Sequence, residues 1–181
     1  MGKVLIIVGS RREGNSYILA NKIKEELKKD RIISYIIVPG NQKIHLCTGC
    51  MDCDENGICD FTDDMKNNIE ALKNDDYIMF ITPTRWNLLS GDIKIFMDRL
   101  NPLYSREELK NKKMIAVAIG AKPKDFCSID SALNSLENFC ESSKMNLIIK
   151  KQFYNCLKEE DILNNKDEID NFIEEIKNAM K

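Results

Sequence analysis

The chain has 181 residues, with 27 lysines and arginines against 29 aspartates and glutamates and a formal net charge of −2 at pH 7. This length favours one domain, residues 1–181, around one core. Because no basic run is interleaved with aromatic residues, the charge pattern argues against a nucleic-acid partner. The apolar run near the N-terminus is too short for a signal or a membrane span, so we expect a cytoplasmic protein without membrane attachment.

Apolar strands alternate with amphipathic helices along the chain. Residues 4–8 form a continuous β-branched run, which is typical of a strand buried on both faces of a parallel sheet. Further strands are predicted at 32–38, 77–82, 114–119 and 147–153, and helices at 16–29, 62–73, 90–100, 128–143, where Ser128 would be the cap, and 167–180. Five successive βα units predict an α/β fold with a doubly wound, five-stranded parallel sheet of strand order 2-1-3-4-5.

The loop after the first strand reads G-S-R-R-E-G-N-S at residues 9–16. It approaches a nucleotide-triphosphate loop, but Asn15 replaces the lysine that such a loop needs. It also departs from the dinucleotide motif, because Arg11 occupies the second glycine position. Free backbone N–H groups at a helix start, with the hydroxyls of Ser10 and Ser16, suit a single terminal phosphate. The alternative is a plain turn with Asn15 as the helix cap.

The loop after the third strand reads T-P-T-R-W-N-L-L-S-G at residues 82–91, followed by K-I-F-M-D-R at 94–99. Its tryptophan, Trp86, could cover a planar ring. Together the two loops resemble the flavodoxin-like, NADPH-dependent FMN reductase family. In that family G-S-x-R-x-x-N-[ST] binds the flavin phosphate, and P-x-Y-W…S-G…K-x-F-x-D-R follows the third strand. The resemblance covers most of the chain through residue 120.

The resemblance implies FMN as cofactor and assigns its site residue by residue. It implies that Ser10, Arg12, Gly14, Asn15 and Ser16 hold the phosphate, that Pro83, Thr84, Arg85, Trp86 and Asn87 line the isoalloxazine, and that Gly120 lies near the ring. Arg85 departs from the family's tyrosine, and its charge would favour the anionic reduced ring. We expect Lys94, Asp98 and Arg99 to pin their helix to the sheet.

A cysteine-rich insertion, residues 45–62, follows the second strand and carries Cys47-x2-Cys50-x2-Cys53-x5-Cys59. Thiols in a reducing compartment are more often ligands or reactive groups than disulfides. This spacing lets three thiolates wrap a cubane cluster while the fourth comes from a short loop. Structural zinc and ligand-free thiols are the alternatives.

The cysteine spacing is similar to the compact motif of iron–sulfur flavoproteins, a branch of the same family. That similarity implies a [4Fe–4S] cluster held by all four cysteines of the insertion. We expect His45 to be an ordinary loop histidine rather than a ligand. Cys127, Cys140 and Cys156 are expected to be small buried residues.

The leading hypothesis is an FMN-dependent oxidoreductase that passes electrons between its flavin and a [4Fe–4S] cluster, without a catalytic acid or base. The resemblance further implies a homodimer or homotetramer, with NAD(P)H, ferredoxin, a quinone or a similar small molecule as donor or acceptor. One alternative is a cluster-free NAD(P)H-dependent FMN or quinone reductase. An alternative of another class is a metal- or thiol-based redox sensor.

Overall fold

The structure is a computed structural model that describes residues 2–126 and 129–181. Its centre is a five-stranded sheet of order β2-β1-β3-β4-β5 in which every neighbouring pair is parallel. The strands are β1 (Val4–Val8), β2 (Ser34–Ile37), β3 (Tyr77–Pro83), β4 (Lys113–Ile119) and β5 (Asn146–Phe153). This arrangement confirms the predicted α/β fold and strand order.

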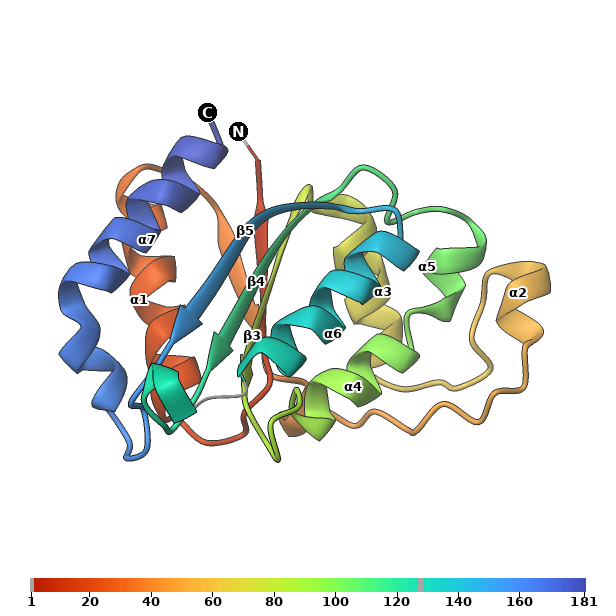
Figure 1. Cartoon of the computed structure of the whole chain (residues 1–181). Helices are drawn as coiled ribbons and strands as arrows, with labels where there is room; N and C mark the ends of the chain where they lie inside the picture. Colours follow the sequence, from red (N-terminus) through yellow and green to blue (C-terminus); the bar gives the residue numbers. More distant parts are fainter. Residues whose placement is uncertain (1, 127–128) are drawn as a thin grey trace.

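Helices cover both faces of the sheet (Figure 1). They are α1 (Asn15–Lys29) and α7 (Lys166–Ala179) on one face, and α3 (Met65–Asn74), α4 (Gly91–Asp98) and α6 (Ile129–Ser142) on the other. Alternate residues of β1 enter two separate apolar cores, with Val4 and Ile6 facing α1 and α7, and Leu5 and Ile7 facing the other layer. No helix in the described part of the chain is long and apolar enough to cross a membrane.

The structure adds elements that the sequence pattern did not reveal. A short helix, α2 (Asp52–Asn56), lies inside the cysteine-rich insertion, and α5 (Asn101–Ser105) follows α4 directly. Pro102 lies in the first turn of α5, where a missing N–H costs nothing, so this proline starts a helix where we expected only an end. Single 3-10 turns occur at η1 (Pro39–Asn41), η2 (Lys124–Phe126) and η3 (Asp161–Asn165). Ser128, the expected cap of α6, lies outside the described residues.

Candidate functional site

The loops that follow β1, β3 and β4 lie at the same edge of the sheet (Figure 1), as parallel strands require. Gly9 follows the last residue of β1, where the loop after β1 packs closely against β3 and the start of α4. Its N–H donates to the carbonyl of Ile81 at 2.8 Å. A Cβ at Gly9 would lie 2.4 Å from Ser90 Oγ and 2.5 Å from Ile93 Cγ1, at the start of α4. Only glycine therefore allows this close approach.

Gly9→Ala is expected to destabilise the protein by about 1–3 kcal/mol, the usual cost of forcing a methyl group into a packed site. The displaced Ser90 also caps α4, because its Oγ accepts a bond from Ile93 N at 3.3 Å. Chemical unfolding at neutral pH measures the loss. The matched control is Gly91→Ala, since no atom lies within 4 Å of a Cβ there. Equal stability of the two variants would contradict the close-packing argument.

The first loop has the backbone of an anion site. None of the N–H groups of residues 10–16 donates to a backbone carbonyl of the described residues. Gly14 is the N-cap of α1 and supplies no side-chain cap, so the positive end of the helix dipole stays open. Ser16 is buried in the first turn, Ser10 makes only a long contact of 3.5 Å to the Arg12 carbonyl, and Arg12 is exposed. The loop is thus free to receive a phosphate.

The side-chain amide of Asn15 forms hydrogen bonds with the segment that follows β5. It donates to the carbonyls of Cys156 at 3.1 Å and Lys158 at 2.7 Å, and its oxygen accepts from Ile162 N at 2.9 Å. Both of its donor hydrogens are therefore in use, which leaves none for a phosphate. The capping alternative also fails, since Gly14 is the cap. In this structure Asn15 holds the segment after β5 against the start of α1.

The second loop is a tight two-residue hairpin. Arg85 N donates to Leu88 O at 2.8 Å, and Leu88 N returns a bond to Arg85 O at 2.9 Å. The two central residues, Trp86 and Asn87, have φ angles of 49° and 66°. Such positive pairs belong to the hairpin turns that point both central side chains outward. Trp86 is accordingly 97% exposed and covers nothing within this protomer.

Hydrogen bonds between loops fix the rest of this edge. Thr84 N, directly after Pro83 at the end of β3, donates to Ile119 O at 2.9 Å. Gly120 is buried, donates to Phe153 O at 2.9 Å and accepts from Cys156 N at 3.0 Å. The residues predicted to contact a flavin thus come from loops that lie at one edge of the sheet.

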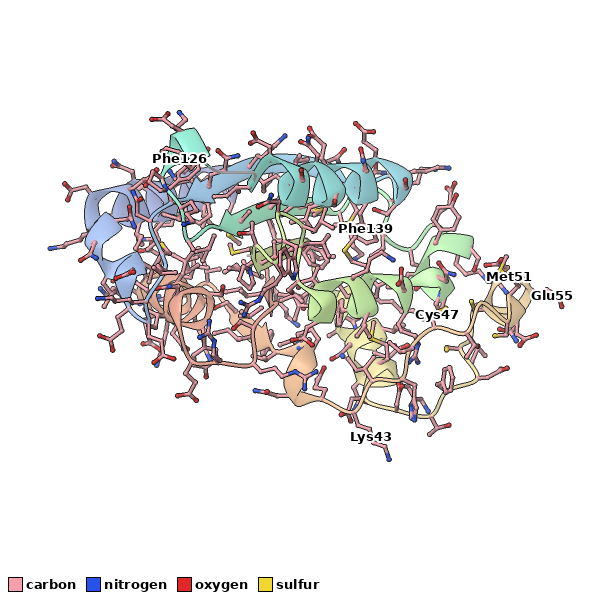
Figure 2. All side chains as sticks on the ribbon, turned by 60° about the horizontal axis from the view of Figure 1, so that its bottom comes forward. Lys43, Cys47, Met51, Glu55, Phe126 and Phe139 are labelled. Carbon is pink, nitrogen blue, oxygen red and sulfur yellow. The ribbon has the colours of Figure 1, made fainter. Side chains whose placement is uncertain are left out.

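The four cysteines of the insertion line one cavity. Its other lining residues are Thr48, Gly49, Met51, Phe61, Asp98, Arg99, Asn101 and Pro102. Cys47 and Cys50 are exposed, Cys59 is half-buried, and Cys53 is buried in α2. Figure 2 shows Cys47, Met51 and Glu55 together at one end of the molecule. The sequence motif therefore folds into a single potential metal centre.

The sulfur spacing bears on which metal would fit. Among the described residues, no three of the four cysteine sulfur atoms lie within 4.8 Å of one another. Tetrahedral zinc would hold them at about 3.8 Å, given Zn–S bonds of about 2.3 Å. A cubane spreads its ligands further, because each thiolate binds a different iron. In the described structure the four sulfur atoms are therefore not gathered as tightly as a bound zinc ion would hold them.

Negative groups surround the cavity. Burial, and then the charges of Asp54, Cys59 and Cys50, raise the pKa of the Cys53 thiol. A hydrogen bond that protonated Asp60 donates to Asp52, and then the charge of Asp52, raise the pKa of Asp60 beside Cys50. A bound metal centre would hold its cysteine ligands as thiolates.

Helix α2 docks on α5, which places Cys53. Ser105 Oγ donates to the Cys53 carbonyl at 3.0 Å, and Arg106 donates to the Glu55 carbonyl at 3.2 Å. Gly57 ends α2 with a φ of 73°, where side chains are strained, and turns the chain toward Cys59. The rigid scaffold helix α5 thus supports the wall of the cavity.

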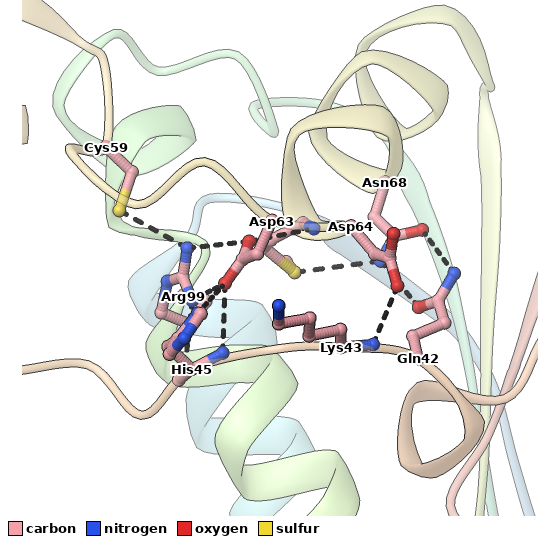
Figure 3. A network of polar contacts seen from close by, with 9 residues as sticks. Gln42, Lys43, His45, Cys59, Asp63, Asp64, Asn68 and Arg99 are labelled. Carbon is pink, nitrogen blue, oxygen red and sulfur yellow. Dashed lines mark hydrogen bonds and ion pairs between the residues drawn. The ribbon is translucent and has the colours of Figure 1, made fainter.

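The two ends of the insertion are joined at a neck, which we define as residues 43–45 and 63–65 (Figure 3). Lys43 N donates to Asp64 Oδ2 at 2.7 Å, and Asp64 N donates to Lys43 O at 3.1 Å. His45 N donates to Asp63 Oδ2 at 2.9 Å, and Met65 N to Asp63 Oδ1 at 3.0 Å. These bonds hold the start and end of the cysteine segment side by side. The carboxylates that we expected to open a helix do so, since Asp64 is the N-cap of α3 and Asp63 accepts from its first residue, and they also close the neck.

Arg99 crosses from the end of α4 to this neck rather than pinning its helix to the sheet as expected. Its side chain is 1% exposed and faces the fully buried Asp63, with Nη1–Oδ2 at 2.7 Å and Nη2–Oδ1 at 3.1 Å. Burial alone would raise the pKa of Asp63, but bonds from Arg99 and His45 hold it well below its usual range. Lys94 and Asp98 pair only with each other on the surface.

The remaining cysteines fit their expected structural role where the structure describes them. Cys140 and Cys156 are buried, and burial raises the pKa of their thiols to about 11 and about 12. Such thiols stay protonated and inert. Cys127 lies outside the described residues.

Comparison with known proteins places the chain in a family. The model of the family described as NADPH-dependent FMN reductase matches residues 2–154. An iron–sulfur flavoprotein of Methanocaldococcus jannaschii is 33% identical over 120 residues, which cover 66% of this chain and 62% of that protein. One of Archaeoglobus fulgidus is 29% identical over 111 residues, covering 61% of this chain and 50% of that protein. The matched region thus spans less than two thirds of these relatives.

Solved structures show the same fold at low identity. A flavone reductase superimposes with a TM-score of 0.73 at 17% identity, covering 95% of this chain and 59% of that chain. An NADPH-quinone reductase from P. pentosaceus gives a TM-score of 0.63 at 13% identity, covering 96% of both chains. The family match is decisive: this chain, which is similar to relatives named iron–sulfur flavoproteins, belongs to the NADPH-dependent FMN reductase family.

Proposed function

We propose that this protein is an FMN-dependent oxidoreductase that also carries a [4Fe–4S] cluster and transfers electrons between the two centres. The observation that carries the proposal is that all four cysteines line one cavity, in a chain whose family is named for FMN. Bound FMN exchanges one or two electrons, whereas a cluster exchanges one. The protein's part is to hold both groups in place and set their potentials.

The FMN site in this proposal is the sheet edge formed by the loops after β1, β3 and β4. The open N–H groups of residues 10–16 and the hydroxyls of Ser10 and Ser16 would hold the phosphate, with Arg12 as its counter-charge. Asn15 and Gly14 shape the loop, Asn15 through its backbone acceptors after β5. The isoalloxazine would lie along the hairpin that contains residues 83–87, near Gly120.

The metal site in this proposal uses Cys47, Cys50, Cys53 and Cys59. All four line one cavity, and the neck keeps the first and last ligands on neighbouring segments. Free thiols of this kind persist only in a reducing compartment, which is why the proposal places the protein in the cytoplasm.

The two sites lie apart in the molecule, since Figure 1 places the loops after β1, β3 and β4 along the lower edge of the sheet and α2 at the right-hand end, beyond α5. Phe126, in the loop after β4, and the cysteine-rich insertion are at opposite ends of Figure 2, and Figure 1 shows the same separation of η2 and α2. Exposed apolar side chains occur at both sites, with Trp86 97% and Met51 58% exposed. A homodimer or homotetramer would cover such side chains and bring the cluster of one subunit to the flavin of another.

The electron donor and acceptor in this proposal are small redox partners. NAD(P)H is suggested by the family's description, and quinones by the structural relative's name. Ferredoxin would suit the cluster as a partner, because both exchange one electron at a time. The balance of positive and negative residues gives no reason to include nucleic acid.

The test is the absorption spectrum and the metal, sulfide and flavin content of anaerobically purified protein. We expect FMN bands together with a broad visible shoulder that bleaches with dithionite, and about one flavin and four irons per chain if the cluster is a cubane. FMN without iron or sulfide would favour the cluster-free reductase. Protein without flavin would contradict the proposal and favour a thiol-based sensor.

A further inference from the structure

We propose that Arg99 is a positioning residue for the cluster: it holds Cys59 through a hydrogen bond, donates its last free N–H into the cysteine cavity, and thereby raises the reduction potential. The inference rests on the proposed cluster. It assigns a role to a residue that lies outside the cysteine motif and comes from the helix after β3.

A count of donors supports this role. Arginine has five N–H groups. Nη1 of Arg99 uses both of its hydrogens, on His45 O and Asp63 Oδ2, each at 2.7 Å. Nη2 uses both of its own, on Asp63 Oδ1 at 3.1 Å and on Cys59 Sγ at 3.4 Å. Only Nε is without a partner, and it is the one buried unpaired side-chain donor or acceptor among the described residues.

The unpaired Nε is unusual because buried polar groups in folded proteins almost always have a partner. Arg99 lines the same cavity as the four cysteines, and its side chain is only 1% exposed, so bulk water does not satisfy the group. The bidentate pair with Asp63 and the contact of the guanidinium with the Phe61 ring, 4.9 Å from its centroid, prevent Arg99 from turning elsewhere. The proposal assigns the missing acceptor to the cysteine cavity, which Cys59, the partner of the neighbouring Nη2, also lines. A cysteine thiolate bound to iron, or a sulfide, is such an acceptor.

The direction of the effect follows from charge. One-electron reduction adds one negative charge to a cluster, and most of that charge resides on its sulfur atoms. Hydrogen bonds to those atoms stabilise the reduced state more than the oxidised state, so they raise the potential. The Asp63 carboxylate offsets the net charge of Arg99, but it leaves the directed N–H bonds in place.

The experiment is a dithionite titration of anaerobically purified protein, followed by electron paramagnetic resonance, with Arg99→Lys against wild type. Lysine keeps a positive charge beside Asp63, but its single ammonium group cannot donate to Asp63 and Cys59 with the planar geometry of a guanidinium. We expect the equilibrium constant for one-electron reduction to fall about tenfold, a shift of about 59 mV to lower potential. The matched control is Arg106→Lys, because Arg106 packs against Gly57 and donates to the Glu55 carbonyl of the same segment, and its loss should leave the potential unchanged.

A second measurement on wild-type protein keeps the test decisive if Arg99→Lys does not fold or bind iron. Protein grown with ¹⁵N-arginine should show a ¹⁵N coupling to the reduced cluster in pulsed resonance, and Arg106→Lys should retain it. An iron-loaded Arg99→Lys protein with an unchanged reduction potential would overturn the role of Arg99 but not the proposed cluster. The absence of an arginine coupling in iron-loaded wild-type protein would do the same. Wild-type protein without iron would instead overturn the proposed cluster and this inference together.

Discussion

Cys50→Ser is expected to remove nearly all of the iron while leaving FMN binding intact. Cys50 is exposed at the rim of the cavity, so its replacement does not disturb the buried packing of α2 on α5. A serine hydroxyl is a poor ligand for this centre, because soft thiolates select iron–sulfur clusters. A protein with three thiolates has lost one of the four ligands that a [4Fe–4S] cluster requires. Metal and sulfide analysis of anaerobically purified protein, with flavin release in parallel, gives the result.

The control for this variant is Cys140→Ala. Cys140 lies on the buried face of α6, and burial raises the pKa of its thiol to about 11, so it offers no thiolate to a metal. Iron content should match wild type in this control even if some stability is lost. Unchanged iron in Cys50→Ser would exclude the cluster geometry proposed for the four cysteines. Loss of both iron and FMN would mean that the insertion supports the flavin edge structurally.

Sequence patterns predicted the sheet and its covering helices, because these elements depend on the periodicity of apolar residues. The run Val4–Val8 is apolar at every position, and the structure buries every residue of it between two helical layers. Turn residues located the ends of strands equally well, since Gly9 and Pro83 both end one. The order of the five strands then followed from the alternation of strands and helices.

The details of the site depended on contacts between distant residues, which periodicity does not encode. Asn15 lies in a loop that suggests a phosphate ligand, yet its partners are carbonyls more than 140 positions away. Trp86 was expected to cover a ring; its turn leaves the side chain exposed, and the contact with a ring stays a prediction. The pairing of Arg99 with Asp63 joins residues 36 positions apart. The one available signal was that an acidic pair, Asp63 and Asp64, follows the last cysteine of the motif after only three residues.

Asp63→Asn is expected to destabilise the protein by about 3–5 kcal/mol, the cost of removing one partner from a buried ion pair. The Asp63 side chain is fully buried, and it accepts bonds from both terminal nitrogens of Arg99 and from the backbone of His45 and Met65. An amide has only one acceptor atom and turns an NH2 group toward one of these donors. The charge of Arg99 would then be buried without its counter-ion. For a chain of this size, the melting temperature should fall by about 6–20 °C.

The matched control is Glu137→Gln, which makes the same acid-to-amide change in an exposed ion pair. Lys150 Nζ lies 2.6 Å from Glu137 Oε2, and the two side chains are 39% and 38% exposed. Such pairs contribute about 0–1 kcal/mol, so this variant should unfold close to wild type. A similar loss in both variants would show that the neck is no more than a surface contact.

The pH dependence of the Asp63→Asn effect separates the buried charge from a change of shape. The pKa of Asp63 is held well below its usual range in the folded protein, so its stabilising contribution is complete above the unfolded pKa of about 3.9. That contribution is lost as the pH falls toward the folded pKa. The free-energy gap between wild type and Asp63→Asn should therefore be constant from about pH 5 to neutrality and narrow below about pH 4. A gap that stays constant through this acid range would mean that the amide costs stability by its shape, and that the neck does not depend on the buried charge pair.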